Sequence, residues 1–74
     1  MTKYQGHRSW NAWNVSLWIN NDESLYREAV RLAQQHGIGR GAALLMRNAL
    51  AGQKTPEGAV YNLTCVREAM RGIV

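Results

Sequence analysis

Hydrophobic residues recur along most of this chain at spacings of three and four, which is the period of an amphipathic α-helix. Ser9 is a good helix N-cap and precedes a first helix expected over about 10–19. The Asn-Asn-Asp-Glu run at 20–23 has the spacing of a capping box and starts a second helix over about 22–36, which Gly37 ends. No segment of useful length alternates with the two-residue period of a strand. We therefore predict an all-α fold.

The second half of the chain carries further helix signals. A third helix is expected over about 40–51, after a glycine-rich connection. The Thr-Pro-Glu sequence at 55–57 combines an N-cap, a proline at the first helical position and an acid in the first turn. It predicts a last helical region over about 56–71. Because Asn62 and Thr64 are both capping residues, this region stays open between one helix and two.

The length of 74 residues fits one domain. We expect a single compact domain of four or five short helices over 10–74. Residues 1–9 show no periodicity and are predicted to form a flexible arm. A domain this small depends on dense helix packing or on self-association for its stability. Its one cysteine, Cys65, is typical of a protein from a reducing cytosol.

Motifs of catalysis, metal binding and targeting are missing from the sequence. His7, His36 and Cys65 do not have the spacing of metal ligands, so we expect no metal site. The N-terminal residues lack the apolar core of a signal peptide, and the longest apolar run, at 42–46, is too short to span a bilayer. We therefore expect a cytoplasmic protein that is not an enzyme, uses no cofactor and does not enter a membrane.

All three tryptophans lie close together, at Trp10, Trp13 and Trp18. Trp13 and Leu17 share a helical spacing and are predicted to anchor the core, because a small helical domain needs large side chains at its centre. Trp10 and Trp18 stay open between the core and a partner-binding surface, since tryptophan is enriched in binding hot spots. A buried Asn14 would need hydrogen-bond partners and would tie the first helix to a neighbouring loop.

Nine Lys and Arg residues against five Asp and Glu residues give a formal net charge of +4. Such a charge favours encounter with nucleic acid or with an acidic protein surface. The basic candidates for partner contact lie on three of the expected helices: Arg27, Arg31, Arg40, Arg67 and Arg71. On the second helix, Glu23 and Glu28 have the spacing to pair with the arginines locally, which is the alternative to partner contact there.

The sequence Trp-Asn-Val-x-Leu-Trp-Ile-x-Asn-Asp-Glu-x-Leu-Tyr at 13–26 resembles a group of small, mostly uncharacterised proteins of bacteriophages and plasmids. The hallmark of that group is a Trp-Asn-x-x-Leu-Trp-x-x-Asn-Asp-Glu-x-Leu-Tyr core near the N-terminus, and the likeness covers about residues 10–33. It implies a helical accessory protein of a mobile element and implies no activity. Small mobile-element proteins without an enzyme motif are often inhibitors of host defence, including anti-CRISPR and anti-restriction proteins.

We therefore predict a protein of the host-cell cytoplasm that binds a host defence complex, such as a CRISPR effector, stoichiometrically and inhibits it. The net charge of +4 argues against a DNA mimic, which needs an acidic surface. The first alternative is a small nucleic-acid-binding module with a helix-turn-helix over 22–51, although Arg40, Arg47 and Asn48 are its only polar base readers. The second alternative is a structural protein that self-associates, for example as a homodimer.

Overall fold

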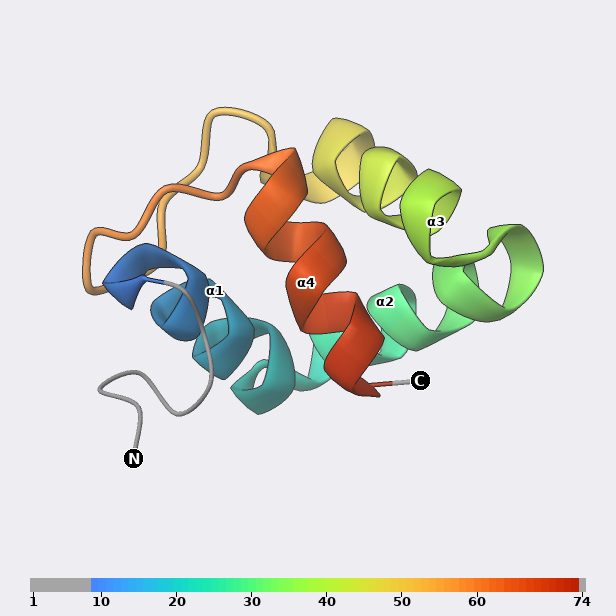
Figure 1. Ribbon diagram of the computed structural model, residues 1–74, viewed down its shortest axis with the longest axis horizontal. Coiled ribbons are helices and arrows are strands. Elements are labelled where there is room, and N and C mark those ends of the chain that lie inside the picture. Colours follow the sequence, from blue (N-terminus) through green and yellow to red (C-terminus); the bar gives the residue numbers. More distant parts are fainter. Residues whose placement is uncertain (1–8, 74) are drawn as a thin grey trace.

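The computed structural model describes residues 9–73, in which the chain forms four α-helices and one short π-helical turn (Figure 1). The elements are α1 (Trp10–Asn21), α2 (Glu23–His36), α3 (Ile38–Leu45), η1 (Met46–Leu50) and α4 (Leu63–Ile73). The described part of the chain contains no strand, only an isolated bridge between Lys54 and Val60. The prediction of an all-α domain with four or five short helices is confirmed. The arm predicted over 1–9 lies outside the described residues, except for Ser9.

Side-chain caps start the first two helices. The Ser9 hydroxyl accepts a hydrogen bond from the Ala12 N–H at 3.1 Å, as the sequence predicts for an N-cap. The second cap differs from the expected capping box, because α1 continues to Asn21 and Asp22 becomes the N-cap of α2. Its carboxylate accepts a hydrogen bond from the Leu25 N–H at 3.2 Å. A negative side chain at this position also suits the positive end of the helix dipole.

A single residue, Gly37, connects α2 to α3, with a φ of 83° that reverses the chain at low cost only for glycine. The glycine-rich connection expected before residue 40 is therefore wrong, since α3 already begins at Ile38. Gly41 lies inside α3 and is buried. A Cβ atom built on it would lie 3.0 Å from the Leu32 backbone, so α2 and α3 approach each other closely here.

The Thr-Pro-Glu sequence does not start a helix, and the expected helical region over 56–71 is wrong in its first part. Residues 51–62 form a connecting loop instead, and α4 begins only at Leu63. Thr55 and Ala59 close a turn within this loop, because the Thr55 N–H donates to the Ala59 carbonyl at 2.8 Å. Asn62 caps α4 by accepting a hydrogen bond from the Cys65 N–H at 2.9 Å. The capping signal at Asn62 is therefore the one that the chain uses.

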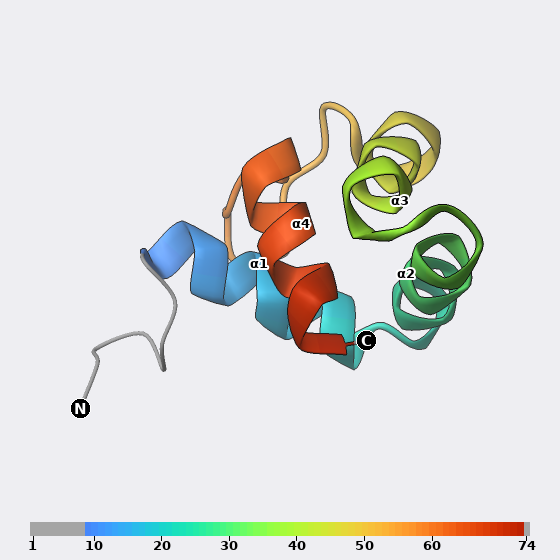
Figure 2. The ribbon, with the colours of Figure 1, turned by 45° about the vertical axis from the view of Figure 1, so that its right-hand side comes forward.

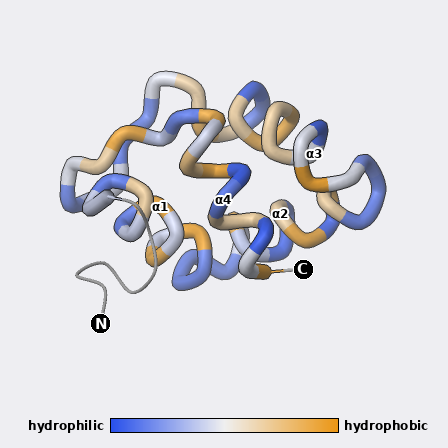
Figure 3. Tube along the Cα trace, in the orientation of Figure 1, coloured by the Kyte–Doolittle hydropathy of each residue, from blue (hydrophilic) through white to orange (hydrophobic). Residues whose placement is uncertain are grey.

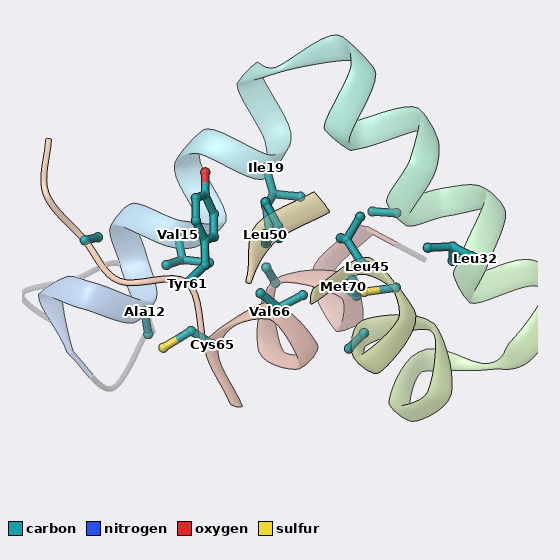
Figure 4. Close-up of a cluster of buried hydrophobic side chains, with 14 residues drawn as sticks. Ala12, Val15, Ile19, Leu32, Leu45, Leu50, Tyr61, Cys65, Val66 and Met70 are labelled. Atoms are coloured by element: carbon teal, nitrogen blue, oxygen red, sulfur yellow. The ribbon is translucent and has the colours of Figure 1, made fainter. Parts of the chain in front are cut away.

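The helices pack in two pairs, α1 with α4 and α2 with α3, and the core fills the space between them (Figures 1 and 2). Each helix contains both hydrophilic and hydrophobic residues, as expected for helices with one buried and one exposed side (Figure 3). The largest fully buried apolar side chains come from α1, α3 and α4 (Figure 4): Val15, Ile19, Leu45, Val66 and Met70.

No tryptophan belongs to this core. The inward face of α1 consists of Ala12, Val15 and Ile19, at spacings of three and four. Trp13 and Leu17 therefore lie on another side of the helix, where both are only half-buried. The prediction that they anchor the core is wrong, because the smaller side chains of α1 already fill the space against α4.

Candidate interaction surface

The outer side of α1 presents a row of large apolar side chains, which we call the aromatic face: Trp10, Trp13 and Leu17. Their spacings of three and four residues place them along one side of the helix. Trp10 is 41% exposed, and the other two are half-buried but lie outside the hydrophobic core. Burial of a tryptophan side chain stabilises a fold by a few kcal/mol. A domain this small that leaves Trp10 exposed therefore forgoes part of that stabilisation.

The aromatic face has the composition of a protein interface. All twelve residues of α1 are uncharged. The buried centre of a protein interface is depleted of charged residues and enriched in aromatic ones. A partner that covers Trp10 would therefore gain apolar contact without having to desolvate a charge on α1.

Trp18, the second tryptophan proposed for partner contact, has a different role in the fold. Its indole Nε1–H donates a hydrogen bond to the Glu57 carboxylate at 3.0 Å, and its side chain is half-buried. This bond joins α1 to the loop over 51–62. The structure therefore separates the two candidates, since Trp10 points outward and Trp18 supports a loop.

Asn14 is the centre of a polar network between α1 and the same loop. Its side chain is fully buried, and both ends of its amide are hydrogen-bonded. The oxygen accepts from the Thr55 hydroxyl at 2.6 Å, and the nitrogen donates to the Glu57 carboxylate at 2.7 Å. The expectation that a buried Asn14 ties the first helix to a neighbouring loop is confirmed. The hydrogen bonds from Asn14 and then Trp18 hold the pKa of Glu57 below its usual value, because they stabilise the ionised form.

Asn11 ties α1 to a second point of the loop. Its side-chain nitrogen donates to the Val60 carbonyl, and its oxygen accepts from the Val60 N–H, both at 2.8 Å. The Asn11 side-chain amide thus bonds to both backbone groups of Val60, as a residue on a neighbouring β-strand does. Reasoning from the sequence missed Asn11 and Glu57, because their partners lie about forty or more residues away along the chain and no local pattern marks such contacts.

The arginines of α2 are paired with acids on the same helix. Arg27 forms an ion pair with Glu23, and Arg31 forms a two-point contact with Glu28 at 2.9 and 2.5 Å. The hydrogen bonds from Arg31 lower the pKa of Glu28. The alternative that these two arginines pair locally with acids of their own helix is therefore confirmed. Because their charges are solvated and largely neutralised by these acids, the two arginines have little charge left to offer a partner.

The other arginines proposed for partner contact make no ion pair within residues 9–73. Arg40 and Arg71 are exposed, and Arg67 is half-buried. An exposed arginine of η1, Arg47, shares this property and lies seven residues after Arg40. These four residues belong to α3, η1 and α4, whereas the aromatic face belongs to α1.

Residues 9–73 enclose no pocket and bring together no group of histidine, cysteine and acidic side chains that could hold a metal ion. Cys65 is a free, buried residue of the core. Within the same described range, none of the helices has both the length and the apolar character needed to cross a membrane.

Comparison with known proteins gives one match. The profile of a protein family described as a family of unknown function (DUF7249) matches residues 1–74, which is the whole sequence. No curated protein and no solved structure matches the chain.

Proposed function

We propose that this chain, which belongs to the DUF7249 family, acts by stoichiometric binding through the aromatic face of α1 and has no catalytic step. We further propose that its partner is a host defence complex, of the CRISPR or restriction type, which it inhibits in the host cytoplasm. The aromatic face supports the binding, and the resemblance of residues 13–26 to proteins of mobile elements supports the choice of partner.

The exposure of Trp10 is the observation that carries the proposal. The core contains alanine, valine, isoleucine, leucine, methionine, tyrosine and cysteine, while all three tryptophans remain outside it. Tryptophan contributes more to binding free energy than most residues when it fills a pocket of a partner. A single helix that presents Trp10, Trp13 and Leu17 fits the way in which amphipathic helices dock into apolar grooves.

The helix-turn-helix alternative has one supporting observation, the close packing of α2 against α3. The connection between them is a single glycine, whereas a DNA-reading helix-turn-helix has a turn of three or four residues. Arg40 is the only exposed polar side chain of α3, the would-be recognition helix, whose other exposed residues are Gly39 and Ala43. Sequence-specific base recognition is therefore the weaker proposal.

A plating assay tests the inhibition directly. The chain is expressed in bacteria that carry an active CRISPR or restriction system, and the efficiency of plating of a targeted phage is measured. We expect plating to rise with the native chain and to fall back with Trp10→Ala. Tyr26→Ala is the matched control, since Tyr26 is an aromatic residue of α2 with 39% exposure, against 41% for Trp10. Unchanged plating across a panel of such systems, or equal loss in both variants, would contradict the proposal.

A further inference from the structure

Every acidic side chain of the protein already has a partner. The sequence has five Asp and Glu residues, and all lie within the described range. Glu23 and Glu28 pair with arginines of α2, and Glu57 accepts hydrogen bonds from Asn14 and Trp18. Asp22 caps α2, and Glu68 is also engaged. Within residues 9–73, Arg27 and Arg31 are the arginines for which the structure shows an ion pair with these acids.

Four of the five described Lys and Arg residues without an ion pair belong to α3, its continuation η1, and α4, and α3 packs against α4. We call these four residues together the basic face: Arg40, Arg47, Arg67 and Arg71. Arg40 and Arg47 lie two helical turns apart, and Arg67 and Arg71 lie one turn apart, so each pair follows one side of its helix. On α4, the side that enters the core carries different residues, Cys65, Val66, Ala69 and Met70.

The chemistry of this face fits a phosphate backbone. Arginine binds phosphate with paired N–H donors, and its charge attracts a polyanion over a longer range. The other exposed residues of α3 are small, Gly39 and Ala43, so the helix backbone beside Arg40 can approach a duplex closely. Unpaired bases would need aromatic side chains for stacking, but the exposed aromatic residues of the described chain, Trp10 and Tyr26, belong to α1 and α2.

We infer that the basic face binds the sugar-phosphate backbone of duplex DNA without reading its sequence. Arg40, Arg47 and Asn48 are the only exposed side chains of α3 and η1 that can read base edges, and with the two arginines assigned to phosphate too little remains for base-specific contact. The binding site is separate from the aromatic face, so it does not depend on the proposed inhibition. An inhibitor with both surfaces would engage a defence complex where it holds DNA.

The chain offers a matched pair of double variants for the test. Arg67→Gln/Arg71→Gln and Arg27→Gln/Arg31→Gln each remove two positive charges at a spacing of four residues on one helix. The first pair is free of ion pairs within residues 9–73, whereas the second is neutralised by Glu23 and Glu28. The two double variants therefore change the net charge of the protein equally. They differ in the position of the lost charges and in whether those charges were paired with an acid.

Binding is measured by fluorescence anisotropy with a labelled 20-base-pair duplex at several salt concentrations. We expect the native protein to bind with a Kd of about 1–100 μM at physiological salt, as non-specific backbone binding does, and more tightly at lower salt. In Arg67→Gln/Arg71→Gln, we expect Kd to rise about tenfold and the slope of log K against log salt to become shallower by about 2, one unit for each lost phosphate contact. Arg27→Gln/Arg31→Gln should change Kd by less than about threefold, since its arginines already have partners.

Three results would overturn the inference. These are no binding of the duplex at low salt, equal weakening by the two double variants, and tighter binding of single-stranded than of duplex DNA. Arg67→Lys/Arg71→Lys guards against a loss of folding, because it keeps the charge and should restore most of the affinity. Trp10→Ala should leave the Kd for DNA unchanged, which separates this site from the proposed inhibitory surface.

Discussion

At the scale of single residues, a fully buried amide ties the first helix to the loop over 51–62, while the tryptophans stay outside the hydrophobic core. Asn14 has no exposed surface and joins α1 to Thr55 and Glu57. Asparagine is a poor helix former, and its presence inside α1 makes sense only through these contacts. The sequence predicts that Asn14, if it is buried, must have hydrogen-bond partners, but it does not identify them. In the sequence, Thr55 and Glu57 have the pattern of a helix start, whereas in the fold both bind the Asn14 side chain.

Replacing Asn14 with alanine should destabilise the protein by about 2–4 kcal/mol, because the buried Thr55 hydroxyl loses its acceptor and a fully buried side chain is removed. Asn20→Ala is the control, since Asn20 is exposed and bonds only to Ser16 within its own helix. Its cost should stay within about 0.5 kcal/mol. Urea unfolding followed by circular dichroism measures both values. Equal stability of the two variants would show that the network contributes nothing.

The same network should make stability depend on pH in the acid range. The pKa of Glu57 is lowered in the folded state, so its contribution is present above the pKa of the unfolded chain and is lost as pH falls through the folded pKa. Glu57→Gln keeps an oxygen that accepts the two hydrogen bonds but cannot titrate. We expect its melting temperature to fall less than that of the native protein between about pH 5 and pH 3. Parallel curves for the two proteins would contradict a stabilising role of the ionised carboxylate.

At the scale of elements, the local signals of the sequence succeed where the structure is also local. Ser9 starts α1, and Gly37 ends α2, because each acts on its own helix. The Thr-Pro-Glu signal fails because Gly58, three residues after Thr55, takes a φ of 96° that no helix contains. The Thr55 hydroxyl is also engaged by Asn14, far away in the sequence. Tertiary contacts of this kind are not visible in a local pattern.

The packing of α2 against α3 gives a prediction at this scale. Gly41→Ala should cost about 1–3 kcal/mol, because the added methyl group would lie 3.0 Å from the Leu32 backbone, which cannot move aside without shifting α2. Gly39→Ala, two residues earlier in the same helix, meets no atom within 4 Å and should instead stabilise the protein by up to about 1 kcal/mol. Thermal unfolding of the two variants decides the matter. A neutral Gly41→Ala would mean that the helices are not in close contact there.

At the scale of the whole molecule, the helical fold can be predicted from periodicity and caps, while the surfaces cannot. A periodic pattern shows that α1 is apolar on more than one side, but it does not show which side enters the core. The structure assigns the small residues Ala12, Val15 and Ile19 to the core and leaves Trp10 outside. The spacing of Glu23 and Glu28 already indicates local pairing for Arg27 and Arg31, and the ion pairs of the structure confirm it.

The central claim, that the aromatic face of α1 is the binding surface, is tested most directly by the affinity of Trp10→Ala for the target. The target is the defence complex identified in the plating assay, and isothermal titration calorimetry measures both affinity and stoichiometry. We predict one chain per binding site and an increase in Kd of at least about 30-fold for Trp10→Ala, the size of a hot-spot loss. Tyr26→Ala should change Kd by less than about threefold. Equal affinities of Trp10→Ala and the native protein would contradict the account.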